Sequence, residues 1–433
     1  MKIEKGIWQS ELVRNVTKLL SANVLTQAIG LLLYPLLTRM YSQDAFGLLS
    51  LFVSMGSVLA LVATAEYQYA IVLPKSEDVA KSVFRLGGTI LVSVTLLVVL
   101  SIPFAPQISL FFKAPALADW YVLLPLYVFL MGFWALLNYW YNRHKQFGRI
   151  GSYQVSQSVL IAGSKVGFGA AGFLRGGLIV SSVLGPLLSI LAVSGKSIVL
   201  RVKRCLRREE VVSRADALAG MRAAAREYKN FPLYSLPRSL VNNVSANLGV
   251  WMLTPAFGLE RVGVFGLAVT LAFRPLNVLC TSIYQVLFQR TSERVRDGQS
   301  IRLIFRHLLT KTALVAGVLF AGLFFVLPPL CGWLLGEGWR ETGELIRLFL
   351  PWLFFSILVA PICFLSDVFG KQKIALVLEI LLIAARAAGL LWGIWCEDFH
   401  RAVLGYSLGG ALVIGIQLLW YVSLIRRYER TLS

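Results

Sequence analysis

Charged residues are scarce in this 433-residue chain, and acidic residues are the scarcer kind. Only 15% of the residues are charged, with 22 Asp and Glu against 42 Lys and Arg, whereas soluble domains carry about a quarter charged residues. Hydrophobic residues make up 57% of the chain, and the mean hydropathy is +0.71. This composition excludes an ordinary soluble domain and favours an integral membrane protein.

Histidine and cysteine are too few and too scattered to predict a metal site. The chain has three histidines and five cysteines, and none of them has metal-ligand spacing. We expect no metal and no cofactor, and we leave a disulfide between Cys331 and Cys396 open. Ser194–Ser197 contains the letters GKS, but Ile190 stands where a phosphate-binding loop needs glycine. No enzyme motif remains.

Apolar segments of about 20 residues recur along the chain, and that length crosses a hydrocarbon core roughly 30 Å thick. We predict an all-α membrane protein with about twelve transmembrane helices. The approximate limits are 15–38, 46–73, 86–105, 120–141, 151–172, 177–199, 232–256, 262–288, 310–330, 346–366, 374–395 and 402–425. The loops on the outer side are short, which disfavours a glycan polymerase or ligase because such an enzyme needs an external catalytic segment.

The net charge of +20 suggests nucleic acid at first sight. In a membrane protein, however, basic loops mark the cytoplasmic side, and most Lys and Arg fall on the side of both chain ends. We therefore expect both termini in the cytoplasm and no nucleic-acid partner. The start, MKIEKGIWQSELVRNVTKLL, does not have the pattern of a removable signal peptide.

Two stretches, 37–47 and 253–263, share LT, an aromatic residue, an acid and a glycine in register. They lie half a chain apart, which predicts two pseudo-symmetric six-helix bundles around a central cavity. We place the bundles at 1–200 and 231–433, joined by a basic cytoplasmic linker over 201–230. An amphipathic helix on the inner leaflet and a solvated tether both fit the linker.

Four cations lie inside the predicted spans: Lys165, Arg238, Arg274 and Arg386. A cation at a helix centre costs about 2.5–3.5 kcal/mol on insertion scales, so each should face a partner or a water-filled cavity. Arg238 lies near the start of its span, where snorkelling to the interface fits equally well.

Helical spacing places polar residues beside these cations. Asn277 lies on one stripe with Arg274, and Gln154 shares a face with Lys165. We also expect Pro275 to kink its helix. These residues predict a cationic, substrate-binding cavity between the bundles, suited to a diphosphate. Hydrogen bonds between helices are the alternative for the polar residues.

Two acids are also placed inside spans, and either is a candidate for ion coupling. Glu66 lies late in the second span, where a straight helix turns it away from the face of Ser50, Ser54 and Ser57. Glu379 shares a helix face with Arg386, two turns away. An interfacial acid or a local ion pair is the alternative for both.

Two parts of the sequence resemble a known family. One is PLLTRMYSQDAFGLLSL at 35–51, continued by EYQYAIVLP at 66–74. The other is EYKNFPLYSLP at 227–237, followed by Arg274-Pro275 and by YQV at 284–286. Both resemble bacterial Wzx-type O-antigen and polysaccharide flippases of the multidrug/oligosaccharidyl-lipid/polysaccharide exporter superfamily, and the likeness extends over most of the chain.

The resemblance implies a multi-pass protein of the bacterial inner membrane. It implies export of an undecaprenyl-diphosphate-linked oligosaccharide by rocking of the two bundles, coupled to H⁺ or Na⁺. Membrane lipid and other polysaccharide-assembly proteins are the implied partners. Three alternatives stay open: a drug/cation antiporter of the same superfamily, a peptidoglycan-precursor flippase, and a non-transporting scaffold.

Overall fold

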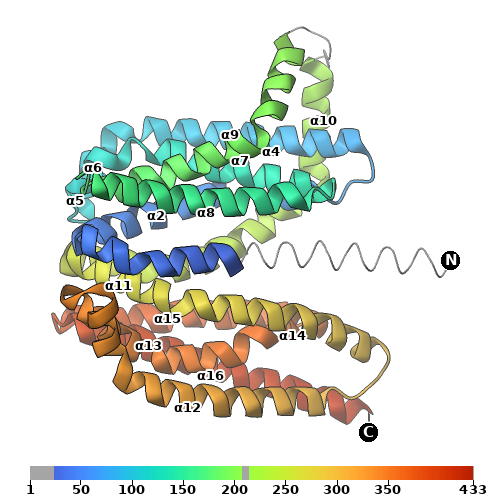
Figure 1. Ribbon diagram of the computed structural model, residues 1–433. Helices are drawn as coiled ribbons and strands as arrows, with labels where there is room; N and C mark the ends of the chain where they lie inside the picture. Colours follow the sequence, from blue (N-terminus) through green and yellow to red (C-terminus); the bar gives the residue numbers. More distant parts are fainter. Residues whose placement is uncertain (1–23, 207–213, 433) are drawn as a thin grey trace. The chain divides into compact units, whose positions relative to one another are not determined.

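A computed structural model describes residues 24–206 and 214–432, and these residues form helices and no strand. The all-α prediction is confirmed (Figure 1). After a helix over Val24–Met40, the long helices are α2 (Gln43–Ala63), α4 (Glu77–Leu100), α7 (Leu124–Arg143), α8 (Phe147–Ala170), α9 (Gly177–Leu206), α11 (Leu236–Arg296), α12 (Arg302–Leu335), α13 (Arg340–Val359), α15 (Gln372–Trp395) and α16 (Phe399–Leu432). The short helices are α3 (Tyr67–Ala70), α5 (Ala105–Phe111), α6 (Ala116–Tyr121), α10 (Arg214–Glu227) and α14 (Leu365–Val368).

Within the described part of the chain, eight helices are long and apolar enough to cross a membrane. The helix Val24–Met40 is too short for this count, and α7 and α8 are not among the eight. These three helices and the second arm of α11 account for the rest of the twelve predicted spans. Several helices continue beyond the predicted limits: α12 begins at Arg302 and α4 at Glu77. The additional helical turns carry charged residues, so a prediction from hydropathy ends these helices too early.

The helix α11 bends sharply at Gly258, where the backbone has φ 82° and ψ 174°. This region of backbone space is open essentially to glycine alone. The bend divides α11 into two arms, which correspond to the predicted spans 232–256 and 262–288. At Pro275, by contrast, the backbone dihedral angles stay helical, and the kink expected there stays a prediction.

The chain divides into two compact units, Met1–Val244 and Ser245–Ser433, which we call unit 1 and unit 2. The described end of the linker belongs to unit 1, because α10 packs along α4 (Figure 1). Ala224 of α10 is buried, and Thr89 of α4 donates a hydrogen bond to the sulfur of Met221. Residues 214–227 therefore form a helix docked on α4 and not a free tether, and its contact with the inner leaflet stays a prediction. Linker residues 207–213 lie outside the described residues.

In unit 2, the helices α15 and α16 approach each other closely through glycines. A Cβ atom added to Gly389 would lie 2.2 Å from the backbone of Gly405, and one added to Gly393 would lie 2.1 Å from that of Ala402. Small residues allow helix backbones this close in a membrane. The contact fixes the face of α15 that points inward, and Arg386 lies on that face.

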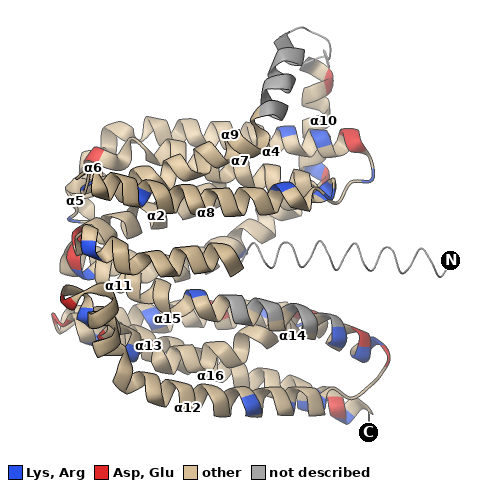
Figure 2. Ribbon diagram, in the orientation of Figure 1, with Lys and Arg blue, Asp and Glu red and all other residues tan. Residues whose placement is uncertain are grey.

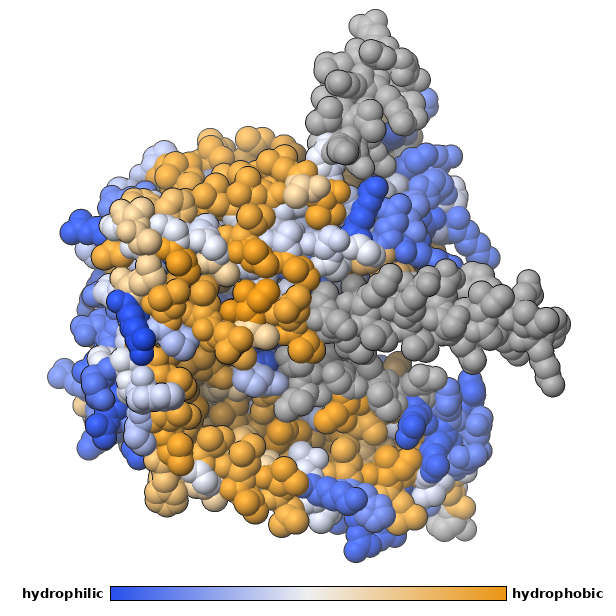
Figure 3. Space-filling view, in the orientation of Figure 1, coloured by the Kyte–Doolittle hydropathy of each residue, from blue (hydrophilic) through white to orange (hydrophobic). Residues whose placement is uncertain are grey.

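Charged residues gather towards the helix ends, and long, mostly uncharged stretches lie between them (Figure 2). The space-filling view shows broad hydrophobic areas over those stretches (Figure 3). Exposed apolar side chains such as Leu97, Val318 and Leu419 belong to these stretches. An apolar belt with charged ends is the surface that a bilayer requires.

Candidate substrate and ion sites

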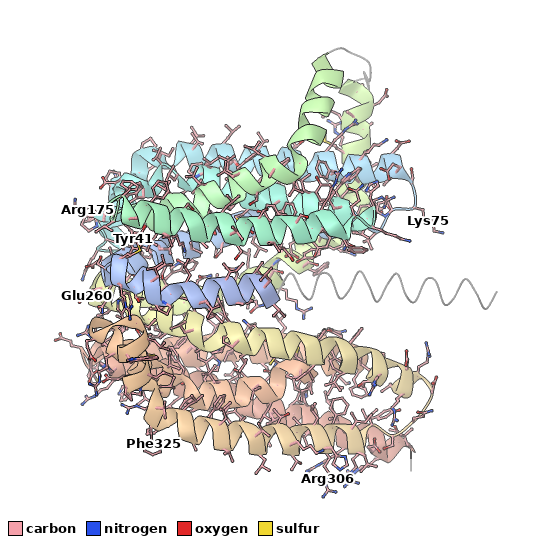
Figure 4. All side chains as sticks on the ribbon, viewed as in Figure 1. Tyr41, Lys75, Arg175, Glu260, Arg306 and Phe325 are labelled. Carbon is pink, nitrogen blue, oxygen red and sulfur yellow. The ribbon has the colours of Figure 1, made fainter. Side chains whose placement is uncertain are left out.

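The helix α8 is the most polar of the long helices of unit 1, and it carries Gln154 and Lys165. Gln154 is half-buried, and its Oε1 is enclosed without a hydrogen-bond partner. Lys165 is half-exposed, and its backbone carbonyl accepts a 2.7 Å hydrogen bond from the hydroxyl of Tyr41, which Figure 4 labels. The two residues share one face of α8, about 16 Å apart along the axis.

The opposite face of α8, which carries Gly163 and Gly167, is lightly packed. A Cβ atom added to Gly163 or Gly167 would meet no atom within 4 Å in the described part of the chain. The middle of α8 is held to the first helix, because the Ser158 hydroxyl donates to the Thr26 carbonyl at 3.2 Å. α8 therefore combines a fixed position with half-exposed polar groups, which suits a helix that contacts a polar ligand.

Glu66 lies where the second predicted span breaks. Ala65 and Glu66 both have left-handed backbone conformations, with φ 45° and 62°. Non-glycine residues there store strain of about 1–3 kcal/mol each, and such strain clusters at functional sites. The break separates α2 from α3 and overturns the argument that placed Glu66 on a straight helix.

The Glu66 side chain is 2% exposed, and its Oε1 has no hydrogen-bond partner. The neighbouring side-chain oxygens Thr64 Oγ1 and Gln68 Oε1 are likewise buried without partners. Burying a polar oxygen without a partner costs roughly 1–3 kcal/mol. The three oxygens are clustered within five residues of the sequence, and a proton or a small cation would satisfy an oxygen of this kind. The alternation Thr64-x-Glu66-x-Gln68 in an apolar run was the signal for this cluster.

The segment after Glu66 is fastened to α7 by Arg143. The Arg143 guanidinium donates to the carbonyls of Ile71 at 3.2 Å and Pro74 at 2.6 Å. It also pairs with Glu77 at 3.2 Å. Arg143 therefore holds both the end of the EYQYAIVLP stretch and the start of α4, which limits the movement of the Glu66 turn. Sequence reasoning missed this role.

Arg386 is the most enclosed of the predicted cations, with 6% of its surface exposed. Its guanidinium lies over the rings of Trp352 on α13, at 4.3 Å, and Tyr406 on α16, at 5.2 Å. One nitrogen donates to the Ser245 hydroxyl at 3.2 Å. Its Nε–H is buried without an acceptor, and no carboxylate among the described residues pairs with it within 4.0 Å. An anion would satisfy this donor.

The other predicted residues differ in exposure. Arg274 is half-exposed on the second arm of α11, Asn277 is exposed, and Arg238 is exposed in the first turn of α11. Glu379 is half-exposed on α15. The structure brings the Arg274 region near Arg386, because Phe273 packs 4.1 Å from Trp352. Thr281 and Gln285, which continue the stripe of Arg274 and Asn277 at helical spacing, lie outside the described side chains.

A charged cluster joins three helices at the end of unit 2 where α13 and α16 begin. Arg261 of α11 pairs with Glu341 of α13, and His400 of α16 lies 3.5 Å from Glu341 and 3.6 Å from Glu344. Asp398 accepts a hydrogen bond from the backbone N–H of Arg401, which lowers the pKa of its carboxyl. Among the described residues no group of His, Cys, Asp and Glu is suited to hold a metal. Cys331 and Cys396 are free thiols.

Solved structures and a family profile show which proteins this chain resembles. The fold is that of the MOP superfamily. An inward-facing multidrug-resistance MATE transporter of that superfamily is 15% identical, with a TM-score of 0.68, over 95% of this chain and 96% of that one. The lipid II flippase MurJ in an inward closed conformation is 12% identical, with a TM-score of 0.71, over 97% and 91%. These likenesses show the fold alone.

The family profile described as "Polysaccharide biosynthesis protein" matches residues 36–344. The chain therefore belongs to the polysaccharide biosynthesis protein family. No curated protein sequence matches it. The match covers both stretches of the sequence that resembled polysaccharide flippases.

Proposed function

We propose that this protein is a flippase for an undecaprenyl-diphosphate-linked oligosaccharide, the repeat unit of O-antigen or a related polysaccharide. It moves this lipid across the bacterial inner membrane by ion-coupled alternating access, with both termini in the cytoplasm. Membership of the polysaccharide biosynthesis family supports the substrate class. The four cations inside the predicted spans support an anionic cargo.

Arg386 is the observation that carries the proposal. A buried guanidinium without a carboxylate partner is costly, because desolvating an ion costs several kcal/mol. In this chain Ser245 and two aromatic rings offset only part of that cost, and the Nε–H stays without an acceptor. A diphosphate supplies the missing acceptor and charge.

The other predicted substrate-binding residues differ in how exposed their side chains are. Lys165 and Arg274 are half-exposed cations, and each suits a contact with a phosphate. Gln154, with its enclosed Oε1, and the exposed Asn277 suit hydrogen bonds to sugar hydroxyls. Arg238 is exposed at the start of α11 and suits a first contact with the diphosphate. A single cavity shared by all these residues stays a prediction.

Ion coupling is assigned to Glu66, with Glu379 as a second acid. The buried Oε1 of Glu66 lacks a hydrogen-bond partner, and a bound proton or small cation would satisfy it. The same acid favours the second candidate function, a drug/cation antiporter of the MOP superfamily. A peptidoglycan-precursor flippase is the remaining alternative within this fold.

The test is export in a cell that lacks its own exporter. Lys165→Gln and Arg274→Gln are each expected to lower surface polysaccharide about tenfold, since a hydrogen bond to a charged group is worth about 1.5–3 kcal/mol. Lipid-linked oligosaccharide should accumulate inside. Lys373→Gln, which removes an exposed cation of α15, is the control and should export normally. Normal export by both variants at normal protein levels would contradict the assignment.

A further inference from the structure

A groove of about 520 Å³ lies on unit 2 where α12 and α13 pack together. Its lining is apolar apart from one cation, and it includes Gly317, Phe320, Phe324, Arg347, Pro351 and Leu404. The volume is that of a ligand pocket, which typically measures about 300–1,000 Å³. Sequence reasoning did not predict this site, and the proposed transport chemistry does not use it.

The groove opens on the part of α12 that faces outward. Phe325 is 77% exposed and points away from the helices of unit 2 (Figure 4). Leu319 and Val318, about two turns earlier, are also exposed. Side chains of this kind belong in hydrocarbon. The groove is therefore a recess in a lipid-facing surface, and its occupant enters from the bilayer.

Arg347 gives the recess a charge. Its guanidinium lies 5.2 Å from the centre of the Phe324 ring, and no ion pair among the described residues involves it. The nearest acid on its own helix face, Glu344, lies 3.6 Å from His400 instead. Arg347 stands seven residues after the start of α13 at Arg340, which places it about 10 Å along the helix. From that depth a long side chain reaches the headgroup level.

We propose that this groove binds a phospholipid with an anionic headgroup, such as phosphatidylglycerol. One acyl chain lies along Gly317, Phe320 and Phe324, and the phosphate pairs with Arg347. The lining offers no second polar side chain, so a sugar headgroup would find no hydrogen-bond partners. A single cation matches a monophosphate lipid better than a diphosphate. The bound lipid would brace α12 against α13.

Two glycines of α12 provide a matched pair of variants. A Cβ atom on Gly317 or on Gly322 would meet nothing within 4 Å in the described part of the chain, so both sites accept a side chain without a clash. Only Gly317 lines the groove. Gly317→Leu therefore fills the recess, while Gly322→Leu makes the same chemical change on another face of the helix.

The experiment is native mass spectrometry of the purified full-length protein, offered equal phosphatidylglycerol and phosphatidylethanolamine with identical chains. The wild type and Gly322→Leu should retain phosphatidylglycerol about tenfold more strongly, because the ammonium group of phosphatidylethanolamine neutralises its own phosphate and weakens the contact with Arg347. Gly317→Leu should lose this retention. Arg347→Gln should retain both lipids equally, while the control Arg306→Gln, at an exposed position on α12, should keep the preference.

Three outcomes would overturn the proposal. Equal retention of both lipids by the wild type would show that Arg347 does not select an anionic headgroup. Equal behaviour of the two leucine variants would place the lipid elsewhere. Undecaprenyl phosphate that displaces phosphatidylglycerol from the wild type, and not from Gly317→Leu, would make the carrier lipid the occupant. None of these readouts requires transport, so they are independent of the proposed flippase function.

Discussion

Replacing Arg386 with methionine is expected to abolish export while leaving the protein as stable as the wild type or more so. Methionine keeps much of the side-chain volume and removes a charge that no described carboxylate neutralises. Replacing buried ions with apolar residues of similar size is often neutral or stabilising by about 1–4 kcal/mol. The functional loss should exceed tenfold, because the charge-assisted contact is lost entirely.

Thermal unfolding in detergent and surface polysaccharide in an exporter-deficient cell measure the two halves of this prediction. Arg386→Lys is the informative second variant. It keeps the charge but cannot lie across both Trp352 and Tyr406 as a planar guanidinium does, so export should fall by a smaller factor than with methionine. A methionine variant that loses stability and export together would make Arg386 a structural residue.

Replacing Glu66 with glutamine is expected to remove the response of transport to an ion gradient. Glutamine has nearly the same shape, so the strained turn at Ala65 and Glu66 can form as before. It cannot release a proton or hold a cation by charge. In membrane vesicles with an imposed pH difference, the wild type should transport faster than without it, and Glu66→Gln should show the same low rate in both conditions.

A matched control and a second gradient sharpen this test. Asp44→Asn changes an exposed acid in the first turn of α2 and should leave the response intact. A sodium gradient in place of the pH difference identifies the ion. If Glu66→Gln responds to either gradient as strongly as the wild type, ion coupling does not pass through this residue, and Glu379 becomes the acid to test.

The hydrophobic pattern of the sequence predicted where the helices lie but not every place where they break. Apolar runs of membrane length predicted a helix at every described span, because hydrophobic length is a local property. The bend at Gly258 falls between two predicted spans, where the glycine indicated that the helix could break. The break before α3 was missed, since Ala65 and Glu66 carry no glycine or proline to mark a left-handed turn. Tertiary contacts impose it, among them those of Arg143.

Sequence patterns predicted which residues belong to the candidate sites but not which residues surround them. The cost of a cation inside a span identified Arg386 as a residue that needs partners. Its actual partners, Trp352, Tyr406 and Ser245, come from three other helices. No spacing within one helix predicts such contacts. The groove at Arg347 was missed for the same reason, because its walls belong to α12 and α13 together.

Transport by the purified protein in liposomes tests the central claim most directly. The vesicles contain undecaprenyl-diphosphate-linked oligosaccharide, and an impermeant glycosidase outside cleaves only sugars that reach the outer leaflet. We predict that cleavage passes from half of the lipid in protein-free vesicles to nearly all of it with the wild-type protein. It should stay at half with Arg386→Met. Cleavage that stops at half with the wild type, under either ion gradient, would contradict the assignment as an oligosaccharide-lipid flippase.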